Sequence, residues 1–273
     1  MRTRTIGTAA TGLGLGLALA AAGATPAFAA DEAQLSVLHG VPGLTVDVYV
    51  NGELTLDDFE PGDLAGPLAL PAGTYTVAIT AADAADDSAP AIGPVDLPLA
   101  ANGNYTAVAH LDAAGAPTAT LFTNDVSATA AGQGRLTVRH VAAAPAVDVL
   151  AGGSAVISGL ENPKESILNI APATLSAAVA AAGTTTPVIG PADVTVTEGV
   201  NTIVYAWGSL SADNLALAVQ TISGLHSAPA GVPSGELGLA DDGAAPTAWL
   251  LGAALLAAGG AAFAVRRRTA VAD

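Results

Sequence analysis

Two histidine–aspartate pairs occur at equivalent places along the chain. His39 is followed by Asp47, and His140 is followed by Asp148 at the same spacing. An imidazole beside a carboxylate can hold a metal ion or relay a proton. One histidine and one aspartate are too few ligands for a metal, and His39 has the strand parity of its apolar neighbours. We therefore expect a structural repeat signature, with each ring half-buried and bonded to a neighbouring loop or carboxylate.

Carboxylates also gather within the first of these two stretches. Asp57 and Asp58 precede a Pro-Gly turn, and Asp83, Asp86 and Asp87 share an Ala-rich segment. Because Ca²⁺ takes oxygen ligands, these five residues are the calcium candidates. Neither group has EF-hand spacing, and acids in loops often remain solvated and keep strand edges from pairing. We expect no cofactor.

The usual catalytic signatures are absent from the sequence. It contains no Gly-x-Ser-x-Gly elbow, no His-Glu-x-x-His, no Ser-x-x-Lys and no phosphate-binding loop. Cysteine is absent too, which excludes disulfides, thiolate catalysis and cysteine-ligated metals. We expect a protein that is not an enzyme.

The histidine–aspartate spacing is part of a longer internal repeat. "SVLHGVPGLTVDVYVNG" is answered by "TVRHVAAAPAVDVLAGG", "IGPVDL" from Ile92 by "IGPADV" from Ile189, and Asn104 by Asn201. Several anchors in the same order indicate duplication of a whole domain rather than a short solenoid repeat. The repeats span residues 35–126 and 136–222, with a flexible linker at 127–134.

Within each repeat the apolar residues recur with a period of two. Val46, Val48 and Val50 alternate with Asp47 and Tyr49, which is the pattern of a half-buried strand. Many short strands separated by turn residues are typical of two tandem immunoglobulin-like antiparallel β-sandwiches, an all-β fold. In the first repeat the expected strands lie near residues 35–39, 46–51, 67–70, 74–80, 92–99, 104–111 and 117–122.

Both ends of the chain carry targeting patterns. Residues 1–30 have the basic, apolar and small-residue regions of a signal peptide. Residues 246–265 are long and apolar enough for a transmembrane helix, and the basic tail 266–273 predicts a cytoplasmic C-terminus. Residues 223–245 have the composition of a stalk. We expect a single-pass membrane protein at the cell surface, with its N-terminus outside.

An alternative anchor is covalent attachment to the cell wall. Leu239, Ala240, Asp242 and Gly243 form a degenerate version of a sortase motif, with Asp242 where a threonine belongs. Because a sortase cleaves after that threonine, the sequence favours the retained membrane helix.

The charge distribution limits the classes of partner. Twelve acids and no lysine or arginine lie within residues 35–126, whereas residues 136–222 contain six acids and two basic residues. Such a surface repels nucleic acid and anionic lipid. If a cation or a basic partner binds, we expect it on the first repeat, with sensitivity to salt.

Three stretches of the first repeat are similar to a known family. "LHGVPGLTVDVYVNG", "LPAGTYTVAI" and "NGNYTAVAHL" resemble the bacterial surface-protein family called domain of unknown function 4397, and the second repeat resembles it less closely. The resemblance implies an extracytoplasmic, β-rich, often tandem module without an established activity, and it supplies no catalytic residues. The Ala-rich, Lys-poor composition also looks actinobacterial.

Taken together, these patterns predict a surface-anchored protein without enzymatic activity. Its two β-sandwich modules would serve binding or adhesion at the cell envelope, with an unknown envelope or extracellular ligand. The alternative is a purely structural envelope spacer or stalk that binds nothing.

Overall fold

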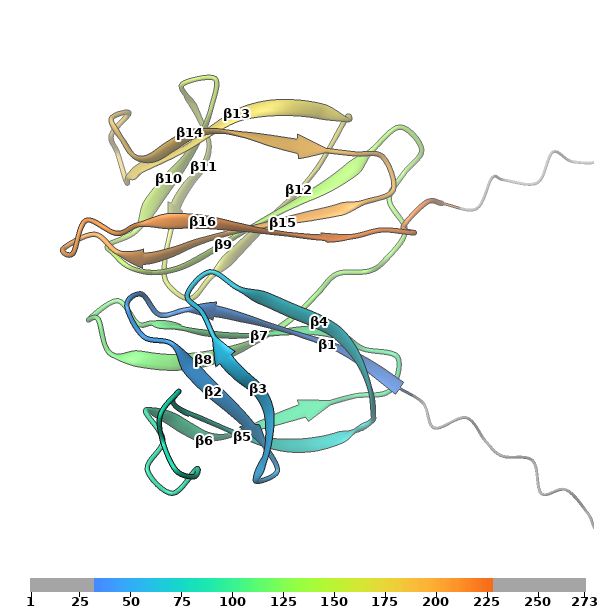
Figure 1. Ribbon diagram of the computed structural model, residues 1–273. Coiled ribbons are helices and arrows are strands. Elements are labelled where there is room, and N and C mark those ends of the chain that lie inside the picture. The colour runs from blue at the N-terminus through green and yellow to red at the C-terminus, as the bar shows by residue number, and fades with distance from the viewer. Residues whose placement is uncertain (1–31, 228–273) are drawn as a thin grey trace, which may run out of the picture. The chain divides into compact units, whose positions relative to one another are not determined.

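The computed structural model describes residues 32–227, which belong to one compact unit. Between these residues the protein is all-β and contains no helix (Figure 1). No helix able to span a membrane is therefore found within residues 32–227. The predicted signal peptide, transmembrane helix, basic tail and sortase-like motif lie outside the described residues.

Each repeat contains eight strands. Those of the first are β1 (Glu32–Gly40), β2 (Val46–Val50), β3 (Glu53–Phe59), β4 (Leu64–Pro71), β5 (Gly73–Ala81), β6 (Ile92–Leu99), β7 (Asn104–Leu111) and β8 (Pro117–Thr123). Those of the second are β9 (Gly134–Ala143), β10 (Val147–Ala151), β11 (Ser154–Leu160), β12 (Glu165–Ile170), β13 (Ala173–Ala181), β14 (Pro187–Val196), β15 (Asn201–Ser209) and β16 (Ala216–Ile222).

The eight strands of a repeat form two four-stranded sheets with apolar residues between them. In the first repeat the sheet orders are β4-β1-β7-β8 and β3-β2-β5-β6. In the second they are β12-β9-β15-β16 and β11-β10-β13-β14. We call β4-β1-β7-β8 and β12-β9-β15-β16 the pairing sheets, and the other two the outer sheets. The predicted β-sandwich arrangement is therefore present in both repeats.

The prediction of purely antiparallel sheets is wrong at one strand pair in each repeat. β1 runs parallel to β7, and β9 runs parallel to β15. Neighbouring strands joined by a short turn must be antiparallel, but these partners are joined by a long path that crosses between the sheets. Their relative direction is therefore set by the tertiary path and leaves no local signal in the sequence.

The seven predicted strand positions of the first repeat coincide with β1, β2 and β4 to β8, whereas β3 was not predicted. In β3 the register shifts between the Val48–Leu56 and Val46–Phe59 pairs, so that Asp57 and Asp58 together lie opposite one residue of β2. This is a β-bulge, which interrupts the period-two pattern. Because of this interruption, the sequence pattern around Asp57 and Asp58 indicates a loop, although both residues lie in a strand.

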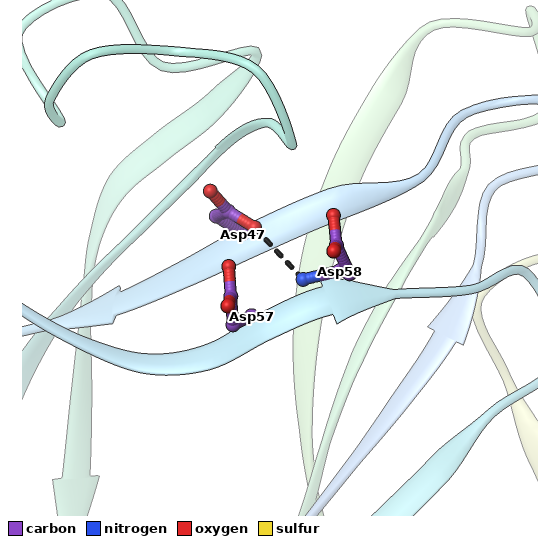
Figure 2. A group of neighbouring side chains, drawn as sticks. All are labelled: Asp47, Asp57 and Asp58. Carbon is purple, nitrogen blue, oxygen red and sulfur yellow. Dashed lines mark hydrogen bonds between the residues drawn. The ribbon is translucent and has the colours of Figure 1, made fainter.

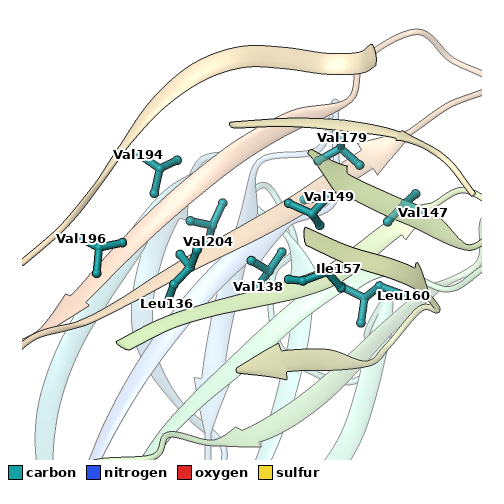
Figure 3. Close-up of a cluster of buried hydrophobic side chains, with 11 residues drawn as sticks. Leu136, Val138, Val147, Val149, Ile157, Leu160, Val179, Val194, Val196 and Val204 are labelled. Carbon is teal, nitrogen blue, oxygen red and sulfur yellow. The ribbon is translucent and has the colours of Figure 1, made fainter. Parts of the chain in front are cut away.

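The core of each sandwich is built mainly from valine, leucine and isoleucine, as Figure 3 shows for the second repeat. Each core also leaves an apolar cavity of about 30 Å³ at matching positions. Val48 and Ile79 line the first cavity where Val149 and Val179 line the second. The side chains that line each cavity lack partner atoms on that side and lose those packing contacts.

The two repeats share a buried interface in place of the expected flexible connection. Leu38, Val108 and Phe122 of the first pairing sheet lie in one apolar cluster with Val141, Ile203 and Tyr205 of the second. As a result β7, β9 and β15 are buried along almost their whole length, on both faces. The two repeats are therefore packed against each other and are not separate domains joined by a free linker.

The predicted linker is itself held in place. The guanidinium of Arg135 donates to the carbonyl oxygens of Asp125 and Ser127, at 2.9 and 3.0 Å. The Thr129 N–H donates to the Leu225 carbonyl oxygen at 2.7 Å, so the start of the predicted stalk packs on the linker. These bonds fix the segment between β8 and β9 against the second repeat.

Filling the first cavity should stabilise the protein. Ala107 lines it, and the equivalent residue of the second repeat is Val204. We expect Ala107→Val to raise the free energy of unfolding by about 0.5–1 kcal/mol, measured by chemical denaturation. Ala69→Val, on the exposed side of β4, is the matched control and should change it less. A loss of stability in Ala107→Val would show that the cavity cannot accept two methyl groups.

Candidate functional site

The histidines of the repeat signature fasten the loop that follows the first strand of each repeat. His39 Nε2 donates to the Leu44 carbonyl oxygen at 2.6 Å, and His140 Nε2 donates to the Pro145 carbonyl oxygen at 3.0 Å. Both residues are 1% exposed, so they are fully buried rather than half-buried as expected. A carbonyl can only accept, so Nε2 bears the proton in both rings. In each loop the imidazole N–H therefore satisfies a main-chain carbonyl oxygen.

The aspartates of the signature bind backbone N–H groups of the bulged strand. Asp47 Oδ1 accepts from the Asp58 N–H at 3.0 Å, and Asp148 Oδ1 accepts from the Gly159 N–H at 2.8 Å. Asp58 and Gly159 are equivalent and both have a positive φ, 51° and 65°. The extra residue of a bulge has an unpaired N–H, and the buried carboxylate satisfies it.

Within each signature the histidine and the aspartate therefore bind separate backbone groups. No hydrogen bond joins His39 to Asp47, or His140 to Asp148, among residues 32–227. Neither pair is therefore arranged as a proton relay. Their spacing is shared because both repeats need the same loop and the same bulge.

In the first repeat the bulge brings three carboxylates together. Oxygens of Asp47, Asp57 and Asp58 all lie within 4.8 Å of one another, and Asp47 is buried whereas the other two are exposed (Figure 2). The equivalents of Asp57 and Asp58 in the second repeat are Ser158 and Gly159. The cluster is thus confined to the first repeat.

The other calcium candidates lie in the loop between β5 and β6. Asp83 and Asp86 are exposed and Asp87 is half-buried. They do not join the three-carboxylate cluster. Desolvation, followed by the charges of Asp47, Asp87, Asp86 and Asp57, raises the pKa of the Tyr49 hydroxyl. Acids of both predicted groups therefore act on one half-buried side chain of β2.

As a candidate metal centre, the three-carboxylate cluster is incomplete. Calcium takes six to eight oxygen ligands, and one oxygen of Asp47 is already used by the Asp58 N–H. Carboxylates so close together repel one another unless cations screen them. The cluster can attract cations or basic groups, and the geometry alone assigns it no bound ion.

Sequence reasoning missed a buried polar network between the pairing sheets. The Gln220 amide donates to Ser36 Oγ at 3.1 Å, and its oxygen accepts from Thr106 at 3.0 Å and from the Tyr205 hydroxyl at 2.6 Å. The Tyr205 oxygen also accepts from Arg139 at 2.8 Å. Gln220 therefore links both repeats.

Arg139 is the charged member of this network. It is fully buried and forms an ion pair with Glu165 at 2.8 Å. Its guanidinium also lies 4.3 Å from the centre of the Phe122 ring, which belongs to the first repeat. A basic residue in the middle of a strand was the available signal, because a buried arginine must be paired with a carboxylate and hydrogen-bonded, and an aromatic face can stabilise it further.

We expect the two signature aspartates to differ in their contribution to stability. Asp148 accepts a second N–H, from Gly183 at 2.8 Å, whereas within residues 32–227 Asp47 accepts only the Asp58 bond. Asp148→Asn should therefore cost about 2–3 kcal/mol and Asp47→Asn about 1 kcal/mol, measured by chemical denaturation. Asp193→Asn, on the exposed part of β14, is the control. Equal losses would mean that the second bond of Asp148 contributes nothing.

Stability should fall as the solution becomes acidic. Burial lowers the pKa of His39, His110 and His140 below the ordinary 6.5, although backbone carbonyls oppose the shift in each case. Between the folded and unfolded pKa values the unfolded chain binds more protons, so the stability present above pH 6.5 is lost as the pH falls through the folded values.

The measurement is the denaturant midpoint at about pH 8, 6 and 5. His39→Gln keeps an amide donor for the Leu44 carbonyl and should flatten the pH dependence. A midpoint that stays constant or rises on acidification would contradict the prediction.

Comparison with known proteins supports the predicted family for part of the chain. No curated protein matches the sequence. Residues 33–150 match the family described as "Domain of unknown function (DUF4397)". The match begins in β1 and ends at the last residue but one of β10, so it includes the whole first repeat, both signature pairs and the first two strands of the second repeat. Residues 33–150 therefore contain a DUF4397 domain.

Proposed function

We propose that this is a surface-anchored protein without enzymatic activity that displays a binding or adhesion module at the cell envelope. The observation that carries this proposal is the acidic outer sheet of the first repeat. Exposed acids follow its strands and loops: Glu53, Asp57, Asp58, Asp83, Asp86 and Asp96. The pairing sheet of the same repeat is covered by the second repeat, so the acidic face is the one left for a ligand.

The chemistry of this face favours a basic or cation-bridged envelope ligand. Every formal charge within residues 35–126 is negative, so attraction does not depend on one orientation of the partner. Recognition would run along the exposed face and edge of the sheet, where β3 and β6 are the outermost strands. We place no catalytic group and no cofactor in this proposal.

The cellular address rests on the sequence. A signal peptide at residues 1–30 and a transmembrane helix at 246–265 would put residues 31–245 outside the membrane, with covalent attachment through the degenerate sortase motif as the alternative. We also propose that both sandwiches are immunoglobulin-like, which is supported by connections that pass between two four-stranded sheets.

A purely structural spacer is the second candidate. The observation that favours it is the buried network between the pairing sheets, which joins the two repeats to each other. A spacer needs stiffness and no ligand. The two candidates differ in whether the acidic face attaches to anything.

The test is a pull-down of purified residues 31–227 on isolated cell walls of the producing organism, at low and high salt, with calcium or with a chelator. A binding module should attach saturably at low salt and be released at high salt. The variant Glu53→Gln/Asp57→Asn/Asp96→Asn should lose most of this binding. The control Glu161→Gln/Asp193→Asn/Asp213→Asn removes as many charges from the second repeat and should retain it.

Each outcome decides between the candidates. Binding that requires calcium and is lost in the chelator would make the cation a bridge between the acidic face and the wall. Equal losses in the two variants would show that the first repeat has no special role. Absence of binding under every condition would leave the spacer.

A further inference from the structure

The interface between the repeats is formed by equivalent faces. Leu38 and Val108 of β1 and β7 occupy the positions of Arg139 and Tyr205 of β9 and β15. All four lie between the two pairing sheets. Contact between equivalent surfaces is the arrangement of a two-fold dimer, here formed within one chain.

The two faces nevertheless differ systematically in size. At equivalent positions of the two central strands the second repeat has the larger residue, and the pairs are Ser36 and Thr137, Leu38 and Arg139, Gly40 and Val141, Thr106 and Ile203, Val108 and Tyr205, and His110 and Trp207. The face of the first repeat therefore has smaller side chains, and the larger side chains on the face of the second repeat fill the space that these leave.

Trp207 shows this complementarity most directly. A Cβ added to Gly62 would stand 3.1 Å from its ring, and a Cβ added to Gly40 would stand 3.3 Å from its own Cβ. Both glycines belong to the first repeat, so the tryptophan occupies a notch that has no room for side chains. Gln220 adds polar specificity, since its amide requires Ser36 and Thr106 opposite.

Pairing between like repeats would lose these contacts. Two first repeats would leave empty the space that Tyr205 and Trp207 fill. In two second repeats each Arg139 would face the position of Gln220, which is the equivalent of Phe122, and would lose the ring it stacks on. It would keep Glu165 and Tyr205, which belong to its own repeat, but would lose the cation–π contact with Phe122, which is stronger in a buried site than at the surface.

We propose that the second repeat is the dedicated binding partner of the first repeat. The paired faces, with the bonds from the segment between β8 and β9 to the second repeat, hold the repeats together without an intact chain between them, and neither repeat pairs with a copy of itself. Divergence of the second repeat is then a gain of specificity, because it directs each first repeat to a second repeat. This proposal does not depend on any ligand of the acidic face.

The experiment uses the full chain with a protease recognition sequence inserted between Ala130 and Ala131, which are both exposed. After cleavage in mild detergent, the two fragments are separated by size-exclusion chromatography with light scattering. We expect a single peak with the mass of one copy of each fragment. Two peaks, or a peak with two copies of one fragment, would overturn the proposal.

Variants identify the residues responsible. In the cleaved protein Gln220→Ala and Trp207→Ala should raise the dissociation constant of the fragments at least about tenfold. Phe122→Ala acts from the first repeat and should do the same. Val188→Ala, on the outer sheet of the second repeat, is the control and should leave the single peak unchanged.

Circular dichroism of each uncut variant separates a weaker interface from misfolding. A variant that keeps the β-sheet signal of the uncut wild type yet falls into two peaks after cleavage supports the proposal. Folded interface variants that remain in one peak as tightly as Val188→Ala would contradict the size complementarity on which it rests.

Discussion

Burial of the pairing sheets on both faces is the constraint on which the rest of the structure depends. One face of each sheet contributes to the core of its own sandwich, and the other packs on the partner repeat. β7, β9 and β15 therefore have almost no solvent-exposed residues. Each core of valine, leucine and isoleucine leaves a cavity unfilled, and the interface adds a further buried layer that neither repeat would have alone.

This constraint separates the two sheets of the first repeat by role. Its pairing sheet carries small and apolar residues that a second repeat covers, whereas its outer sheet carries exposed carboxylates. The second repeat contributes a buried arginine, a tyrosine and a glutamine to the shared layer. The two sandwiches therefore have the same topology but surfaces of different chemistry.

The repeat signature shows that residues with the types of a catalytic or metal site, recurring within one chain, can have a structural role. His39 and Asp47 have the residue types of a metal site or a proton relay, yet each satisfies a backbone group in a different loop or bulge. Their recurrence as His140 and Asp148 follows from the recurrence of that backbone geometry. The residues that distinguish the repeats, such as Asp57 and Ser158, are the better guide to what only one of them does.

From local periodicity and matching motifs, the sequence predicted the internal repeat, the all-β class and most strand positions. It also identified the acidic character of the first repeat, since charge is a sum over residues. Tertiary contacts set the β3 bulge, the parallel β1–β7 and β9–β15 pairs, and the contact of Gln220 with Ser36 and Thr106. These features join residues far apart in the chain, and the spacing of residues along a strand does not encode which distant strand or repeat will lie opposite.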